Sequence, residues 1–227
     1  MSSGRRQLVL DLPHRPALGR DDFLVAPCNA AAVEWIDNWP DWPGPVLALC
    51  GPGGSGKSHL AAVWQSRSEA HGIDPHAIPK VIESGELPAG HLVMEDMKCP
   101  VDEEALLHLY NMVSERGRTL LLTSAIPPAR WPVKLPDLAS RLRTIPVAEI
   151  GAPDDALLEA LLVKMFADRQ LRVGPDVIAF LLPRMERSFA HVRALVERLD
   201  GAALSQQRTI TIPLARNVLS EEGTDLP

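Results

Sequence analysis

The sequence has few of the features that define secreted or membrane proteins. Its three cysteines, Cys28, Cys50 and Cys99, form no CxxC pair and cannot all pair with one another, which indicates a reducing compartment. The N-terminus has no signal-peptide apolar core, and no uninterrupted apolar run is long enough to span a bilayer. We therefore expect a cytoplasmic protein with no membrane partner.

Excess positive charge is also missing. Lysine and arginine total 23 against 29 aspartate and glutamate, for a formal net charge of -6 and a pI of about 5.6. An acidic chain has no electrostatic footprint for wrapping nucleic acid, so we expect no strong direct DNA binding. The length of 227 residues suits one large domain or two small ones.

One glycine-rich stretch matches the phosphate-binding P-loop pattern GxxxxGK[ST] at every fixed position. An apolar run at residues 46–50 predicts a buried strand entering it, and the apolar spacing after Lys57 predicts a helix leaving it. These flanks argue against a purely structural glycine-rich turn. We assign nucleotide binding to Gly51, Pro52, Gly53, Gly54, Ser55, Gly56, Lys57, Ser58 and the next residue, His59.

The chemistry of this loop favours a di- or triphosphate. Glycines let successive backbone N–H groups turn toward an anion at a helix N-terminus. Lys57 would then neutralise the β- and γ-phosphates, and the Ser58 hydroxyl would bind Mg²⁺. The expected cofactors are ADP or ATP, with Mg²⁺.

Two carboxylates follow a second apolar stretch. Residues 91–96 read as a strand that ends in Glu95 and Asp96, the Walker B arrangement that holds Mg²⁺ with Ser58 and orients the attacking water. Another predicted strand, residues 119–123, is followed directly by Ser124. Because the carboxyl ends of parallel strands face one crevice, we expect Glu95, Asp96 and Ser124 to meet at the phosphates. The alternative is a strand that ends in solvated acids.

The first 20 residues predict a flexible N-terminal arm, because Pro13 and Pro16 prevent a continuous helix. Within it, Leu8, Leu10 and Leu12 lie on one side of an extended peptide. On the residues alone, an edge strand of the protein's own sheet is favoured over a peptide that docks in a partner's groove.

Beyond residue 150 the sequence carries only helix signals, which predicts a second domain. We therefore expect an arm at 1–20, an α/β nucleotide-binding domain at 21–149 and a helical lid at 150–227. The fold class is α/β: a P-loop NTPase with a parallel sheet flanked by helices, followed by a small all-helical domain.

These motifs together resemble a AAA+ module, and more narrowly the branch that contains the replication initiator DnaA and its homologue Hda. Residues 137–142, DLASRL, resemble that branch's arginine-finger box, and residues 191–195, HVRAL, resemble its sensor-2 box. Residues 7–12, QLVLDL, are similar to the hexapeptide by which Hda proteins bind the DNA sliding clamp. This similarity reverses the preference for an edge strand.

The resemblance implies a regulator that, with the sliding clamp, promotes ATP hydrolysis by DnaA and so inactivates it. Arg141 would act in trans in the nucleotide site of the DnaA AAA+ domain, and Arg193 would contact the nucleotide bound here. Clamp binding would use Gln7, Leu8, Leu10 and Leu12, and self-association through AAA+ surfaces is a further contact that the resemblance allows. Glu95 stands where Asp is usual and Asp96 where many AAA+ proteins have Glu, so we expect at most a slow ATPase, with Asp96 as its catalytic carboxylate.

Two other classes stay open on the sequence. An autonomous DnaA-like ATPase or helicase loader acting on DNA would need a basic stripe, against which the net charge of -6 argues. A P-loop kinase would need a pocket for the phosphoryl acceptor in place of the helical lid.

Overall fold

The computed structural model describes residues 22–85, 87–206 and 208–222. The expected clamp-binding residues Gln7, Leu8, Leu10 and Leu12 lie outside this part of the chain. Among the described helices, none is both long and apolar enough to cross a membrane.

A parallel sheet of five strands forms the centre of the N-terminal domain, in the order β2-β3-β4-β1-β5. Every residue of the two central strands β1 and β4 is buried, as expected when helices cover both faces of a parallel sheet. The strands are β1 (Val46–Cys50), β2 (His71–Gly72), β3 (Leu92–Met97), β4 (Leu120–Ser124) and β5 (Val147–Glu149).

Alternating strand residues divide the core between the two faces of the sheet. Leu47 and Leu49 pack against α1 and α2, whereas Val46 and Ala48 pack on the side of α3, α4 and α5. The first layer consists of α1 (Ala30–Asp37) and α2 (Lys57–Ser68); the second consists of α3 (Ile78–Ser84), α4 (Glu103–Glu115) and α5 (Pro136–Thr144). Two single-turn 3-10 helices, η2 (Pro75–Ala77) and η3 (Pro128–Arg130), lie in the connections.

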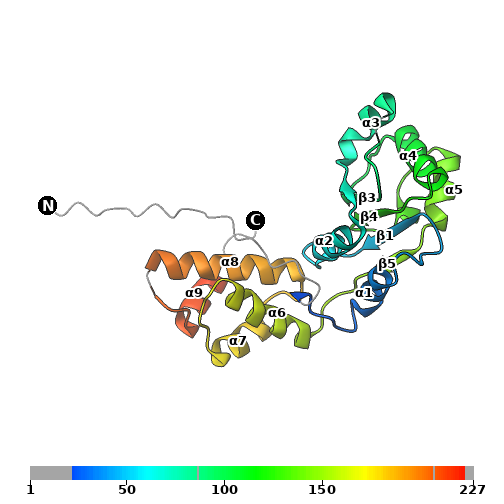
Figure 1. Cartoon of the computed structure of the whole chain (residues 1–227). Coiled ribbons are helices and arrows are strands. Elements are labelled where there is room, and N and C mark those ends of the chain that lie inside the picture. Colours follow the sequence, from blue (N-terminus) through cyan, green and yellow to red (C-terminus); the bar gives the residue numbers. More distant parts are fainter. Residues whose placement is uncertain (1–21, 86, 207, 223–227) are drawn as a thin grey trace.

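The C-terminal part is a helical lid with a core of its own. It consists of α6 (Asp155–Asp168), α7 (Pro175–Leu181), η4 (Leu182–Arg184), α8 (Phe189–Gln206) and α9 (Ile212–Glu222). Figure 1 shows the lid beside the sheet domain, with α8 and α6 nearest to it. The predicted fold class, a AAA+ sheet domain followed by a helical lid, is confirmed.

Side-chain caps set where the lid helices begin. The sequence predicts that α6 starts at Pro153, but it starts at Asp155 because the Asp154 carboxylate accepts a hydrogen bond from the Leu157 N–H at 2.8 Å. Ser188 caps α8, and its hydroxyl accepts from the His191 N–H at 3.1 Å.

Candidate nucleotide site

A cavity of about 860 Å³ lies between the sheet domain and the lid. This volume suits a nucleotide-sized ligand. Three parts of the chain line it: the segment before α1, the P-loop with the carboxyl ends of β3 and β4, and the lid helices α6 and α8. The residues expected from the sequence that line it are Gly53, Gly54, Ser55, Gly56, Lys57, Ser58, His59, Glu95, Asp96 and Arg193.

The P-loop wraps around the Lys57 side chain. The ammonium group of Lys57 donates to the carbonyls of Gly51 at 2.8 Å and Pro52 at 2.9 Å. An ammonium group has three donors, and these bonds use two of them. Burial lowers the pKa of Lys57, and the Asp96 carboxylate opposes that shift. Gly51 and Pro52, which the sequence predicts to bind the nucleotide, contact Lys57 through these carbonyls and do not line the cavity.

The loop provides a group that a bound phosphate would satisfy. The Ser55 side chain is 4% exposed, and its hydroxyl has no hydrogen-bond partner within the described residues. An unpaired buried hydroxyl is costly, whereas a phosphate oxygen at this position would accept its hydrogen. The hydroxyl lies just before the N-terminus of α2, which favours negative charge. The P-loop thus fits a nucleotide's phosphate groups.

The two acidic residues lie within β3 and not at its end. The pairing of β3 with β4 shifts between Met94 and Met97, so Glu95 and Asp96 together face Thr123. Asp96 has a left-handed backbone (φ 55°), and its N–H donates to the Thr123 hydroxyl at 2.8 Å. Strict alternation would send consecutive side chains to opposite faces, but this bulge exposes both acids beside the cavity.

Ser124, expected to face the phosphates, lies elsewhere. Its fully buried hydroxyl donates to the Ile126 carbonyl at 2.7 Å and contacts the Cys50 thiol at 3.3 Å. Thr123, the preceding residue, lines the cavity instead. Because neighbouring strand residues face opposite sides of a sheet, only one of the two can reach the site.

The segment at residues 22–29 closes one side of the cavity by packing directly on the P-loop. A Cβ atom at Gly56 would lie 2.8 Å from the Phe23 ring, and this ring meets the His59 ring edge-on with centroids 5.3 Å apart. Asn29 occupies the N-cap position of α1, but its side chain makes no capping hydrogen bond to the helix. Its side chain accepts from the Ala26 N–H at 2.8 Å and donates to the Leu24 carbonyl at 2.9 Å, which fixes the segment.

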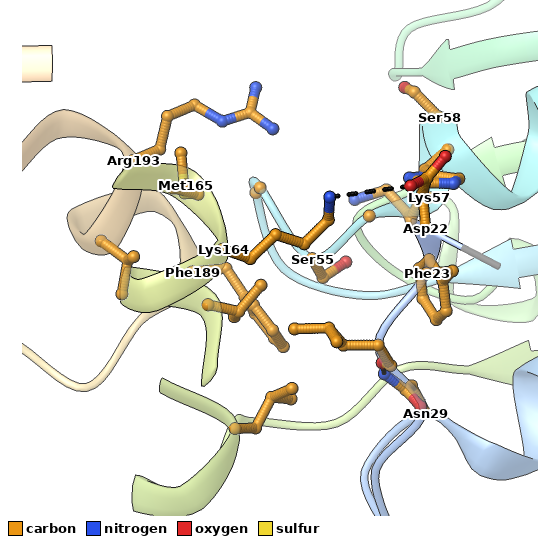
Figure 2. A pocket seen from close by; sticks show the side chains of 18 of the residues that line it. Asp22, Phe23, Asn29, Ser55, Lys57, Ser58, Lys164, Met165, Phe189 and Arg193 are labelled. Atoms are coloured by element: carbon orange, nitrogen blue, oxygen red, sulfur yellow. Dashed lines mark hydrogen bonds and ion pairs between the residues drawn. The ribbon is translucent and has the colours of Figure 1, made fainter. Parts of the chain in front are cut away.

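The lid approaches the P-loop from the opposite side. At Gly54 (φ 76°), an added Cβ would lie 3.0 Å from the backbone nitrogen of Ala190 in the first turn of α8. Arg193, one helical turn further, is exposed at the cavity, and Figure 2 shows it above Met165 and Lys164 on the lid side.

The sequence analysis missed several lid residues that line the cavity, among them Leu161, Lys164, Met165 and Arg169. Lys164 lies 3.1 Å from Asp168 and 4.0 Å from Asp22, and Arg169 lies 3.8 Å from both Glu197 and Asp200. No local motif marks these residues. Only the docking of the lid brings them to the site.

Arg141 does not line the cavity of its own chain. It is exposed on α5, and its guanidinium carbon lies 5.5 Å from the centre of the Tyr110 ring. The side chain is therefore accessible to another molecule.

The cavity also presents the oxygen ligands that Mg²⁺ prefers. Ser58 lies in the first turn of α2, and Glu95 and Asp96 face the same cavity. The Lys98 ammonium lies 2.6 Å from one oxygen of the Asp96 carboxylate. Among the described residues, no group of three or more His, Cys, Asp and Glu side chains could hold a metal ion, so bound phosphates would have to complete such a site.

Comparison with known proteins places the lid in a family. Residues 154–219 match the family model described as the Hda lid domain. Domain III of the replication initiation protein DnaA from Thermotoga maritima has a similar structure, with a TM-score of 0.76, 18% identity, and coverage of 92% of this chain and 98% of that one.

Two further structures share the architecture at lower similarity. AMPPCP-bound DnaA from Aquifex aeolicus gives a TM-score of 0.64 and 16% identity over 82% of this chain and 66% of that one. The Holliday junction branch migration motor RuvB of Thermotoga maritima gives 0.60 and 15% over 84% and 66%. At these identities the structures show a common fold.

A P-loop on a five-stranded parallel sheet, with a nucleotide-sized cavity under a helical lid, defines a AAA+ module. Its lid is of the Hda type. The lid thus matches the Hda lid family model, and the whole chain has the fold of DnaA domain III.

Proposed function

We propose that this protein binds an adenine nucleotide and, with the DNA sliding clamp, promotes ATP hydrolysis by DnaA, thereby inactivating the initiator. The position of Arg141 carries this proposal: the residue is exposed and lies outside its own nucleotide cavity. An arginine placed in this way can stabilise charge on a phosphoryl group that is held by another subunit. The Hda-type lid on a DnaA-like sheet domain supports DnaA as the partner.

The nucleotide would bind with its phosphates on the P-loop. Lys57 and the Ser55 hydroxyl would contact them, and Ser58, Glu95 and Asp96 would hold Mg²⁺ between the phosphates and β3. Phe23 and Leu24 would line the base, since both face the cavity beside the apolar lid residues Leu157 and Leu161. Arg193 would contact the nucleotide from the lid. In the related DnaA of Aquifex aeolicus, the bound ligand is the ATP analogue AMPPCP.

The protein itself would hydrolyse ATP slowly. Its own site contains the exchanged acids Glu95 and Asp96, with Lys98 paired to Asp96, and its own Arg141 does not reach that site. An arginine supplied by a neighbour can change the rate of phosphoryl transfer by a factor on the order of 10³ to 10⁵. Turnover of several ATP per second by the isolated chain would identify it as an autonomous motor instead.

A single-turnover assay with radiolabelled ATP on DnaA tests the proposal. Wild type with clamp on DNA should accelerate hydrolysis, and Arg141→Ala should remove this acceleration while leaving nucleotide and clamp binding unchanged. Arg143→Ala is a matched control, because Arg143 is also exposed on α5. Stimulation by Arg141→Ala equal to that of wild type would show that another residue acts, or that the protein acts differently.

Clamp binding is tested separately through the sequence at residues 7–12. Burying one leucine is worth roughly 1.5–3 kcal/mol, so the loss of Leu8 should be easy to detect. Gln7→Ala with Leu8→Ala should abolish capture by immobilised clamp and leave the melting temperature unchanged. A melting temperature lower by many degrees would instead indicate an edge strand of the protein's own sheet.

A further inference from the structure

A lysine of the lid and an aspartate of the segment before α1 face each other across the nucleotide cavity. The Lys164 ammonium on α6 lies 4.0 Å from a carboxylate oxygen of Asp22. The two side chains are 25% and 39% exposed, and both residues line the cavity. Figure 2 shows Lys164 extended from the lid past Ser55 toward Asp22, with the ion pair dashed.

The two ends of this ion pair are anchored in different parts of the molecule. Next to Asp22, Phe23 packs on Gly56 of the P-loop, and Asn29 fixes the same segment with two hydrogen bonds. On the other side, α6 is anchored in the lid core, where its neighbouring residues Leu162 and Phe166 are buried. Movement of the lid away from the P-loop would therefore separate Lys164 from Asp22.

We propose that the Asp22–Lys164 ion pair is a latch that holds the lid over the nucleotide cavity and so sets how long a bound nucleotide stays. The inference rests on the proposed nucleotide binding and adds to it a control of release. A nucleotide under the lid leaves when the lid moves, and the latch must break first. After it breaks, Lys164 keeps its closer partner Asp168 at 3.1 Å. The lid residues Leu157 and Phe189 also pack in the sheet-domain core, and the ion pair adds to this packing.

The latch and the direct effect of the Asp22 charge on the nucleotide predict opposite changes in the rate of nucleotide release. Asp22 is a negative charge beside the site of an anionic ligand, so removing this charge should by itself slow nucleotide release. If Asp22 acts through Lys164, removing its charge should speed release instead. The direction of the change on Asp22→Asn therefore separates the two explanations.

The experiment measures the dissociation rate of radiolabelled ADP from the full chain after a chase with excess unlabelled ADP. Asp22→Asn and Lys164→Met should each accelerate release by up to about fivefold, the range of a partly exposed ion pair. The double variant should be no faster than either single variant, because both break the same contact. Asp22→Glu keeps the charge and should restore slow release.

Two control variants remove the same charges away from the cavity. Lys80→Met lies on the exposed face of α3, and Asp41→Asn lies in the exposed loop before β1. Both should release ADP at the wild-type rate, and all variants should melt close to wild type.

Any other result would contradict the proposed latch. Slower release from Asp22→Asn would show that Asp22 acts only through its charge on the nucleotide, and additive acceleration in the double variant would show that the two residues act separately. An unchanged rate in both single variants would show that the pair does not restrain the lid. If wild type retained no ADP at all, the nucleotide site itself would be wrong, whereas retention without acceleration by Asp22→Asn refutes the latch alone.

Discussion

The cavity has a P-loop wall, formed by residues 53–59, and a lid wall, formed by residues of α6 and α8. The two walls are held in different ways. On the P-loop wall, Lys57 makes bonds of 2.8 and 2.9 Å to backbone carbonyls, and the loop packs on the Phe23 ring. On the lid wall, Lys164 and Arg169 make ion pairs of 3.8–4.0 Å to Asp22, Glu197 and Asp200. Loose ion pairs near the surface are weak and break readily.

This difference indicates a division of roles between the walls. The P-loop wall has few ways to rearrange, so it should determine whether a nucleotide binds. The lid wall carries Lys164 and Arg169, each with more than one acidic partner, beside apolar residues such as Leu161, so it should adjust how tightly and for how long the nucleotide is held. Substitutions on the two walls should therefore differ in size.

The largest effect is expected on the P-loop wall. Lys57→Ala removes a charge-assisted contact to phosphate, so ADP and ATP affinity should fall by more than tenfold, or about 1.5–3 kcal/mol. Isothermal titration calorimetry measures this change. Lys80→Ala, on the exposed face of α3, is the control. Unchanged affinity in Lys57→Ala would contradict the phosphate-binding role of the loop.

A second substitution, Asn29→Ala, should loosen the segment at residues 22–29. This segment packs on the P-loop through Phe23 and pairs with the lid through Asp22. Asn29 is 2% exposed, and Asn29→Ala removes its bonds to Ala26 and Leu24. We expect a loss of about 1–3 kcal/mol in unfolding free energy, or about 2–4 °C in melting temperature per kcal/mol. Asn29→Asp keeps the acceptor for the Ala26 N–H and should lose less. If both variants melted like wild type, the segment would not depend on this residue.

A smaller effect is expected on the lid wall. Arg193 is exposed at the cavity, so its contact with a nucleotide is partly screened by solvent. Arg193→Ala should weaken ADP binding by up to about fivefold in the titration used for Lys57→Ala. A loss as large as that of Lys57→Ala would show that the lid wall contributes equally and would contradict the division proposed here.

The smallest effect concerns a group remote from both walls. Burial, followed by the Arg118 charge, lowers the pKa of His91, which bonds to Thr119 and stacks edge-on with Trp39. The unfolded chain then binds more protons than the folded one below pH ~6.5, so this residue's stabilising contribution falls as pH drops below that value. Melting curves from pH 7 to 5 should slope less in His91→Asn than in wild type.

Glu103 does not contribute to this slope between pH 7 and 5. Hydrogen bonds from the backbone of Lys134 and Leu135 lower the pKa of Glu103, so its stabilising contribution is lost only below pH ~4.5. Equal slopes in wild type and His91→Asn between pH 7 and 5 would show that His91 does not titrate as inferred.

The sequence predicts the P-loop wall better than the lid wall because the former is local. Residues 51–58 carry their own strand and helix signals, so Lys57 and Ser58 can be placed without tertiary information. The bulge at Glu95 and Asp96 depends on the pairing of β3 with β4, and so does the choice between Thr123 and Ser124. Because β4 is buried on both faces, an alternation of polar and apolar residues predicts neither the bulge nor which of Thr123 and Ser124 faces the cavity.

The lid wall depends on packing between distant segments. Lys164 lies 142 positions after Asp22 in the sequence and follows no motif, so its place at the cavity is visible only once the lid is docked. Only the resemblance of residues 191–195 to a sensor-2 box predicts Arg193 at the site. The helices themselves are predictable, since Pro175 and Ser188 mark the starts of α7 and α8.

A titration of the wild-type chain with ADP and with ATP tests the central claim most directly. The P-loop, the buried Ser55 hydroxyl and the lid above them predict one nucleotide per chain, bound below millimolar concentration and raising the melting temperature. No adenine nucleotide binding below millimolar concentration, with an unchanged melting temperature, would contradict the account.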